Sequence, residues 1–147
     1  MNNKLLLEAV DKFGTPLYIY DSNMIKSQYN RLKQSFKDVK NLQINYAVKA
    51  LSNISILKYM INMGSGIDAV SIQEVKLALK AGVNPKKILY TPNGVSIEEI
   101  KEVSELGVSI NIDNLEVLEQ FGNLNPDIPV CISCLLYTSD AADDRSW

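Results

Sequence analysis

The stretch GIDAVSIQEVKLALKAG, residues 66–82, contains the repeating unit of this chain. Its first part, residues 66–71, is rich in apolar and β-branched side chains and predicts a strand. Ser71 and Glu74 then have the spacing of a capping box, in which the serine oxygen accepts a backbone N–H of the first helical turn and the glutamate reaches back to the serine N–H. Apolar residues follow at spacings of three and four, and Gly82 suits the left-handed conformation that ends many helices. The stretch therefore predicts one strand followed by one helix.

The same unit recurs along the chain at a nearly constant interval. Successive strand centres are 21, 22, 21 and 20 residues apart when they are placed at Tyr46, Ile67, Leu89, Ile110 and Val130. This interval is the length of one strand and one helix with short loops. The predicted strands are 42–49, 66–71, 87–93, 108–114 and 128–133.

Helix boundaries support the alternation independently of the strands. Ser96 and Glu99 form a second capping box, and Gly107 provides a second helix end. An earlier helix is predicted after Asp21, with Asp21 or Ser22 as its N-terminal cap.

Strands that alternate with helices predict a parallel α/β fold, because a parallel crossover needs about a dozen residues and the helix provides them. Doubly wound sheets and closed eight-stranded barrels both satisfy this pattern. The constant interval favours the barrel, in which every unit has the same geometry. A barrel of this kind typically needs about 250 residues, whereas this chain offers five strands in 147 residues. We therefore expect the N-terminal half of a partial (β/α)8, TIM-like barrel.

Composition excludes several classes of partner. The chain is 46% hydrophobic and 22% charged with a net charge of −2, and its acidic and basic residues are interspersed. We therefore expect binding neither to nucleic acid nor to membranes. No segment has the length of a membrane span, and the default expectation is a cytoplasmic protein. Cys131 and Cys134 stand alone without histidine, so we expect no metal site.

The last 14 residues, CLLYTSDAADDRSW (134–147), abandon the strand–helix pattern. They resemble the translation of a transposase-type sequencing adapter, and such segments are excluded from fold reasoning. We interpret 134–147 as a non-native tail. A native C-terminus without regular structure is the alternative.

Lys49 has an unusual place in the sequence NYAVKALSN, residues 45–53. It closes a predicted strand just before a turn into a helix that begins near Ser52. In parallel barrels the carboxyl ends of the strands form the active-site mouth, so this position favours a functional lysine. The alternative is a strand-end lysine that extends into solvent.

Five motifs in order resemble the N-terminal half of the fold-type III PLP-dependent decarboxylases, with diaminopimelate decarboxylase as the most similar member. The resemblance runs from about Lys12 to about Ile132. The motifs are FGTPLYIYD (13–21), YAVKA (46–50), GSGIDAVSIQEV (64–75), ILYTPNGVS (88–96) and INIDN (110–114).

The resemblance implies an α/β barrel followed by a β domain, into which the TPLYIY segment crosses. The implied organisation has three parts. Residues 1–20 are an N-terminal segment with a strand belonging to the missing β domain, 21–133 are a partial PLP-binding barrel, and 134–147 are the non-native tail.

The resemblance also implies roles for three residues. Lys49 matches the catalytic lysine that forms the Schiff base with pyridoxal 5'-phosphate. Asp68 matches an aspartate near that lysine, and Glu74 matches a glutamate close to the cofactor. The alternative for Asp68 is an ordinary polar residue at a strand end, and the alternative for Glu74 is a helix cap alone. Related enzymes commonly have SGGE where this chain has Ser71-Ile72-Gln73-Glu74, which leaves the local loop geometry open.

The implied reaction is the decarboxylation of meso-diaminopimelate to L-lysine by a homodimeric full-length parent. The family's cofactor-contacting histidine, glycine-rich phosphate loop and pyridine-binding glutamate lie in the second half of the barrel, and we therefore expect this fragment to be inactive. Two alternatives remain open. One is another decarboxylase of the same fold, acting on carboxynorspermidine, ornithine or arginine, and the other is a non-enzymatic PLP homeostasis protein.

Overall fold

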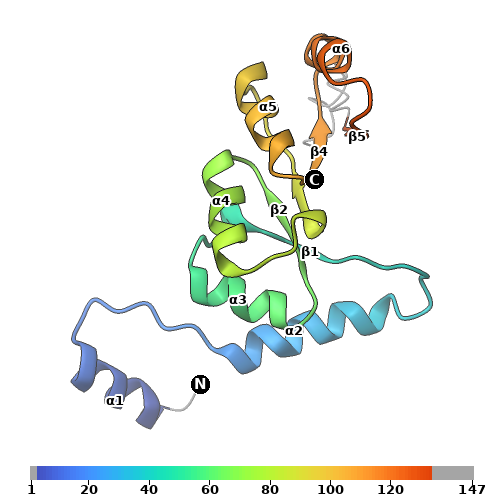
Figure 1. Cartoon of the computed structure of the whole chain (residues 1–147). Coiled ribbons are helices and arrows are strands. Elements are labelled where there is room, and N and C mark those ends of the chain that lie inside the picture. The colour runs from blue at the N-terminus through green and yellow to red at the C-terminus, as the bar shows by residue number, and fades with distance from the viewer. Residues whose placement is uncertain (1–2, 134–147) are drawn as a thin grey trace, which may run out of the picture. The chain divides into compact units, whose positions relative to one another are not determined.

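Five short parallel strands form one sheet in the computed structural model, which describes residues 3–133. The strands follow one another in the order β1-β2-β3-β4-β5 (Figure 1). Each lies within a strand predicted from the sequence. Their bounds are Asn45–Ala47 for β1, Gly66–Ala69 for β2, Ile88–Tyr90 for β3, Ser109–Ile112 for β4 and Val130–Ile132 for β5.

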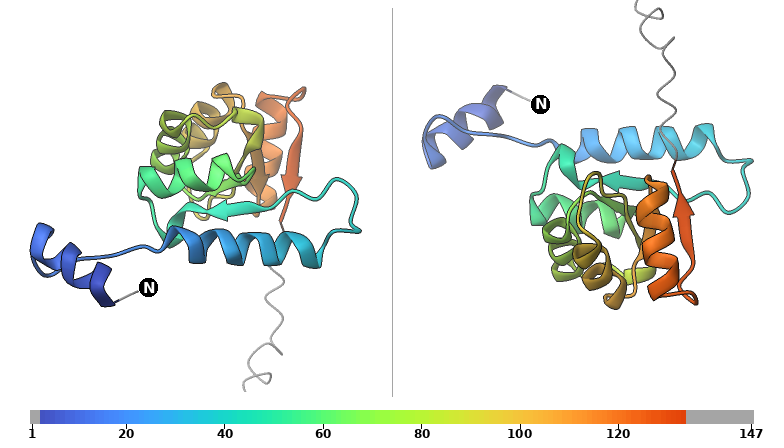
Figure 2. Two further views of the ribbon diagram at one scale, coloured as in Figure 1. Left: turned by 90° about the horizontal axis from the view of Figure 1, so that it is seen from below. Right: turned by 90° about the horizontal axis from the view of Figure 1, so that it is seen from above.

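Helices follow the strands on one side of the sheet (Figure 2). Sequential order with right-handed crossovers places every connecting helix on the same face, whereas a doubly wound sheet reverses its strand order and is covered on both faces. The α/β class is thereby confirmed, and the strand order is that of consecutive barrel units. The helices are α3 Ile54–Asn62, α4 Ile72–Ala81, α5 Ile97–Glu105 and α6 Leu115–Leu124, with 3-10 turns η1 Val48–Ala50 and η2 Pro85–Lys87.

Contacts divide the chain into two compact units, Met1–Leu42 and Gln43–Trp147. The first contains α1, Asn3–Phe13, and α2, Ser22–Ser35. Asp21 caps α2 as predicted: its side-chain oxygen accepts the N–H groups of Asn23 and Met24 at 2.9 and 3.1 Å.

The N-terminal segment contains a helix that the sequence pattern did not predict. Apolar residues do recur at helical spacing in α1, at Leu6, Val10 and Phe13, although none of the residues of this helix is buried. Residues 14–21 are neither helix nor strand. The strand expected in residues 1–20, and the β domain that it would join, stay a prediction.

The hydrophobic core lies between the sheet and its helices. Along each strand, side chains alternate between this core and the opposite face of the sheet. We call the face without helices the inner face. The strand residues buried in the core are Ile67, Ala69, Ile88, Tyr90, Ile110 and Ile112.

The inner face carries the residues between these core positions. Ala47, Asp68 and Leu89 lie side by side on β1, β2 and β3, and Ser109 continues the row on β4. All but Ser109 are half-buried, and Ser109 is exposed. Apolar and polar side chains therefore alternate along this row, on the face that would line the lumen of a closed barrel.

Both predicted capping boxes form only in part. Ser71 accepts the N–H of Glu74, and Ser96 accepts the N–H of Glu99, each at 3.3 Å. The glutamate carboxylates do not complete the boxes on their own serines. Glu74 accepts the N–H of Val70 instead, at 2.8 Å, because the extended chain before the helix brings that amide closer to the first turn.

Gly82 and Gly107 follow α4 and α5 with φ angles of 95° and 71°, as predicted for helix ends. Gly66 serves a different purpose. A Cβ atom there would meet the side-chain oxygen of Asn45, the amide nitrogen of Gln43 at 2.8 Å and the backbone oxygen of Lys87 at 2.9 Å. The last contact is with backbone in the neighbouring strand region, which cannot turn away as a side chain can.

Replacement of Gly66 by Ala is expected to lower the free energy of unfolding by about 1–3 kcal/mol, the usual cost of overpacking. Urea denaturation followed by circular dichroism measures it. Gly122→Ala is the control, because a Cβ at this position in α6 meets nothing within 4 Å, and it is expected to stabilise by about 0.5–1 kcal/mol. Equal effects of the two substitutions would contradict the crowding at Gly66.

Candidate functional site

Lys49 lies at the carboxyl edge of the sheet, as predicted. β1 ends at Ala47, so Lys49 belongs to the 3-10 turn η1 rather than to the strand itself. Its side chain is exposed. The neighbouring Val48 is completely buried in the core, which anchors the turn and fixes where the lysine backbone stands.

Asp68 lies on the neighbouring strand, directly opposite Ala47. Its Oδ1 atom is buried and has no hydrogen-bond partner among the described residues. A buried acceptor without a donor costs free energy and calls for an explanation. Lys49 lies two residues beyond Ala47, the residue paired with Asp68, and no hydrogen bond or ion pair joins the two side chains in the described part of the chain.

Glu74 is bound to the loop between β2 and α4. Its carboxylate accepts the N–H of Val70 at 2.8 Å, and its own N–H donates to the Ser71 hydroxyl. The structure therefore gives Glu74 a loop-closing role one turn away from Asp68. A direct role at the cofactor stays a prediction.

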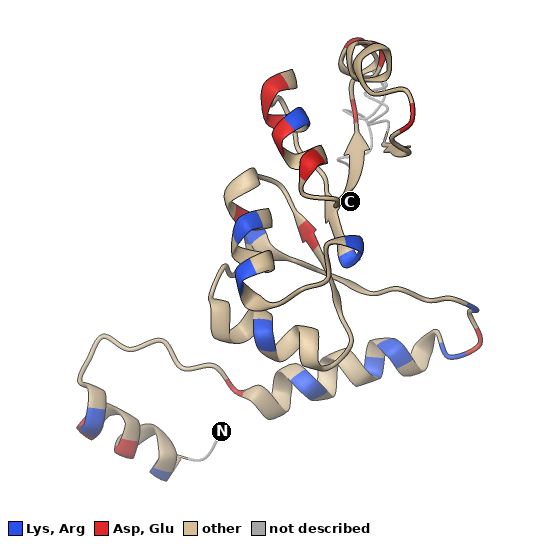
Figure 3. Ribbon diagram, viewed as in Figure 1, with Lys and Arg blue, Asp and Glu red and all other residues tan. Residues whose placement is uncertain are grey.

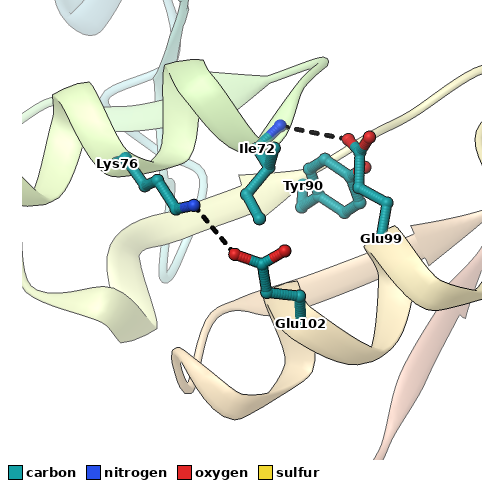
Figure 4. Close-up of polar contacts among 5 residues, drawn as sticks. All are labelled: Ile72, Lys76, Tyr90, Glu99 and Glu102. Carbon is teal, nitrogen blue, oxygen red and sulfur yellow. Dashed lines mark hydrogen bonds and ion pairs between the residues drawn. The ribbon is translucent and has the colours of Figure 1, made fainter.

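Glu99 joins two neighbouring strand–helix units (Figure 4). Its Oε1 atom accepts the Tyr90 hydroxyl at 2.6 Å and the N–H of Ile72 at 3.1 Å. Tyr90 belongs to β3, Ile72 begins α4, and Glu99 lies in the first turn of α5. One carboxylate therefore lies at the positive ends of two helix dipoles, where negative charge is stabilising.

The contact between α4 and α5 is extended by an exposed ion pair. Lys76 and Glu102 approach to 2.8 Å (Figure 4). Lysines on α4 lie beside a glutamate-rich α5 (Figure 3). Because both partners of the pair are solvated, this interaction contributes little compared with the buried one at Tyr90.

The surroundings of Tyr90 raise the pKa of its hydroxyl. Burial is the largest cause, followed by the hydrogen bond to Glu99 and by the charge of that carboxylate. All three disfavour the phenolate. Tyr90 therefore keeps its proton in the folded chain to a higher pH than an unfolded tyrosine does.

Two further polar residues lie on the inner face near the carboxyl edge. Thr91 follows β3 and Asn111 lies in β4, and each has a buried side-chain oxygen without a hydrogen-bond partner in the described region. Neither was singled out from the sequence. The signal that could have found them is the alternation along two predicted strands, which turns Thr91 and Asn111 away from the side of the apolar neighbours Tyr90 and Ile110.

A hollow of about 510 Å³ opens at the same edge, between the loops that follow β3 and β4. Its walls include Asn93 and Gly94 from one loop and Asp113 and Asn114 from the other. Ile100 of α5, Ile112 of β4 and Val117 of α6 also line the hollow, so it lies on the helix side of the sheet and not on the inner face that carries Asp68.

The pyridoxal-binding domain of the pyridoxal-dependent decarboxylases matches residues 22–145. This chain belongs to that family. The recognition made from the motifs is confirmed, and so is pyridoxal phosphate as the cofactor of the family. The match includes most of residues 134–147, which lie outside the described residues, so the non-native origin of that tail stays a prediction.

Curated relatives place the match in the first part of longer proteins. Diaminopimelate decarboxylase of Methanothermobacter thermautotrophicus is 38% identical over 122 residues, which are 82% of this chain and 28% of the relative. The Campylobacter jejuni enzyme of the same name is 45% identical over 104 residues, 70% of this chain and 26% of the relative. The chain thus spans just over a quarter of these proteins.

Solved structures confirm the fold. Diaminopimelate decarboxylase of M. jannaschii in complex with L-lysine has a TM-score of 0.76 and 31% identity over 86% of this chain and 32% of that one. Lysine/ornithine decarboxylase of Vibrio vulnificus in complex with putrescine has a TM-score of 0.78 and 26% identity, over 88% and 35%.

The sequence also predicts no membrane span and no metal site. Within residues 3–133 no helix is long and apolar enough to cross a membrane. The same residues contain no group of three or more metal-ligating side chains. Cys131 is a free, exposed thiol, and Cys134 lies outside the described residues.

Replacement of Glu99 by Leu is expected to cost about 1–3 kcal/mol of unfolding free energy, since it leaves the buried Tyr90 hydroxyl and the Ile72 N–H without an acceptor. Glu99→Gln keeps a carbonyl oxygen available and should lose less than half as much. Urea denaturation measures both. Glu102→Leu breaks the exposed ion pair and serves as the control, with a change within about 0.5 kcal/mol. A Glu99→Leu effect as small as the control would show that the bridge adds no stability.

The stability of the chain is expected to fall as the pH rises above about 10, because unfolded tyrosine loses its proton there while folded Tyr90 retains it. Tyr90→Phe removes this titration and should make the alkaline part of the stability curve less steep, with a remaining slope from Tyr29, whose pKa burial also raises. Denaturation in urea between pH 8 and pH 11 measures the slope. Tyr18→Phe changes an exposed side chain and should leave the slope as it was.

Proposed function

We propose that the full-length parent of this chain is a PLP-dependent decarboxylase that converts meso-diaminopimelate to L-lysine, with Lys49 as the residue that carries the cofactor. The observation that supports it most is the position of Lys49 just after β1, next to the strand that carries the unpartnered Asp68 oxygen, at the carboxyl edge of a pyridoxal-binding domain. Identities of 38% and 45% to diaminopimelate decarboxylases favour this substrate.

The side chains at this edge fit the chemistry of the cofactor. Pyridoxal phosphate supplies an aldehyde for an amine and a ring that accepts electrons when the substrate loses carbon dioxide. Lys49 offers the amine from an anchored turn and can exchange with the amino group of a substrate. An arginine cannot replace it, because a guanidinium stays charged.

Asp68 supplies a hydrogen-bond acceptor for the Lys49 nitrogen when that nitrogen carries the cofactor. Its buried oxygen needs a donor, and a nitrogen held by Lys49, in the turn that follows the neighbouring strand, would provide one. The carboxylate would then fix the direction of that N–H and stabilise positive charge on the nitrogen. Glu74 acts beside it by closing the loop that follows β2 and, as the sequence predicts, at the cofactor.

The proposal concerns the longer parent protein, because this chain spans 28% of the relative from M. thermautotrophicus. We expect the chain as written to be inactive alone. The parent is proposed to be a cytoplasmic homodimer with a small amino-acid substrate.

Incubation of the full-length protein with meso-diaminopimelate and PLP tests the substrate, with L-lysine and carbon dioxide as the expected products. Ornithine, arginine and carboxynorspermidine are assayed in parallel, because the structure also resembles a lysine/ornithine decarboxylase and the related substrates are therefore alternatives. Cofactor binding without release of carbon dioxide from any of them would favour a PLP homeostasis protein.

Borohydride reduction of the PLP-loaded parent protein, followed by peptide mapping, is expected to place the pyridoxyl label on Lys49. Lys49→Arg should abolish the label and lower kcat/KM by about a thousandfold or more. Lys58→Arg alters an exposed lysine on α3 and should change neither. A label on another lysine would remove the assignment.

A further inference from the structure

A second hollow, of about 210 Å³, lies at the edge of the sheet where the strands begin, which we call the amino edge. Asn45 opens β1 and Ser109 opens β4, and both residues line this hollow. Asn45 lies two residues before Ala47 and is therefore, like Ser109, on the inner face. The other walls include Gln43, Lys86, Lys87, Leu89 and Cys131. The hollow is thus at the opposite ends of the strands from Lys49, and the proposed reaction does not use it.

The walls of this hollow are basic. Lys86 and Lys87 line it, and no acidic side chain of the described residues does. Neither lysine forms an ion pair within residues 3–133. Two neighbouring ammonium groups repel each other, and an anion between them reduces that repulsion. A hollow lined by charges of one sign also concentrates ions of the opposite sign.

Gly66 brings neutral hydrogen-bond donors to the same place. A Cβ atom at Gly66 would meet the side-chain amides of Gln43 and Asn45, so both amides lie over this glycine. Nε2 of Gln43 donates one N–H to the carbonyl of Ile44 at 3.2 Å, which leaves its second N–H for another acceptor. The exposed hydroxyl of Ser109 is a further donor on this face.

The chemistry of these groups selects the kind of ligand that they bind. Ammonium groups and amide nitrogens donate hydrogen bonds and accept none. Two positive charges with neutral donors beside them match an anion that carries several acceptor oxygens. Lysine is a common partner of phosphate and carboxylate groups, with which it forms short, charge-assisted hydrogen bonds.

We propose that Lys86 and Lys87, with the side-chain amides of Gln43 and Asn45, bind a small oxyanion at the amino edge of the sheet. The oxyanion is either a free ion such as inorganic phosphate or a carboxylate side chain from the remainder of the full-length parent. The two sources share the same chemistry. The site is separate from the carboxyl edge that carries Lys49, and it does not depend on the proposed reaction.

Cys131 reports on this site, because its exposed thiol belongs to the wall of the hollow. Cys134→Ser leaves it as the single cysteine of the chain. In this background, alkylation by iodoacetate, an anion, is compared with alkylation by the neutral iodoacetamide at low ionic strength. Lys87→Gln is expected to lower the ratio of the two rates by about two- to fivefold, the effect of one unit charge at about 4–8 Å in water. Lys58→Gln changes an exposed lysine on α3 and should leave the ratio unchanged.

Inorganic phosphate tests binding directly. At constant ionic strength, phosphate should slow the alkylation of Cys131 by iodoacetate with a saturable dependence on its concentration. The double variant Lys86→Gln/Lys87→Gln should abolish this protection, and because both side chains are exposed, it is expected to keep the fold. Protection that does not saturate, or that persists in the double variant, overturns the proposal.

Calorimetric titration of the full-length parent with phosphate separates the two sources of the oxyanion. Saturable binding that Lys87→Gln abolishes assigns the site to a free anion. Absence of binding, together with a lower melting temperature for Lys87→Gln than for Lys58→Gln, assigns it to a carboxylate side chain of the parent. Absence of binding with equal melting temperatures overturns the proposal.

Discussion

The parallel hydrogen-bond ladder is the constraint on which the rest of this structure depends. Every strand runs in the same direction and pairs with the next strand in the sequence. The carboxyl ends of all five strands therefore lie at one edge of the sheet, and the helices that connect the strands all lie on one face of it. Lys49, Asp68, Thr91 and Asn111 are brought together by this rule although 62 residues separate the first from the last.

The second level of organisation is the joining of neighbouring units at the same edge. Each unit has a weak point at the start of its helix, where backbone N–H groups lack intrahelical partners. In α4 the Ser71 hydroxyl satisfies part of this need from within the unit, and Glu99 satisfies another part from the next unit. Since Glu99 also holds Tyr90, the loop after β2 depends on side chains from both α5 and β3. The backbone that carries Asp68 is thereby tied to the adjacent unit.

The sequence predicted this fold well because its signals are local. The positions of five strands, the caps at Asp21, Ser71 and Ser96, and the helix ends at Gly82 and Gly107 follow from residues close together in the chain. The partners of the Glu99 carboxylate could not be predicted in this way. A capping box predicts a bond within one helical turn, whereas Tyr90 and Ile72 reach this carboxylate only through the packing of two units. Thr91 and Asn111 were missed for a related reason. Their lack of hydrogen-bond partners is a property of the folded sheet, and residue type alone does not reveal it.

The two outermost strands, β1 and β5, have consequences of their own. Each pairs with a neighbour on one side within the described chain, and β5 leaves Cys131 and Ile132 in contact with solvent. Backbone groups along such a border retain the capacity to accept another strand. At high protein concentration, the edge strands of two molecules can therefore pair with each other. Work with this chain then calls for low protein concentration or for an added segment that covers the edge strands.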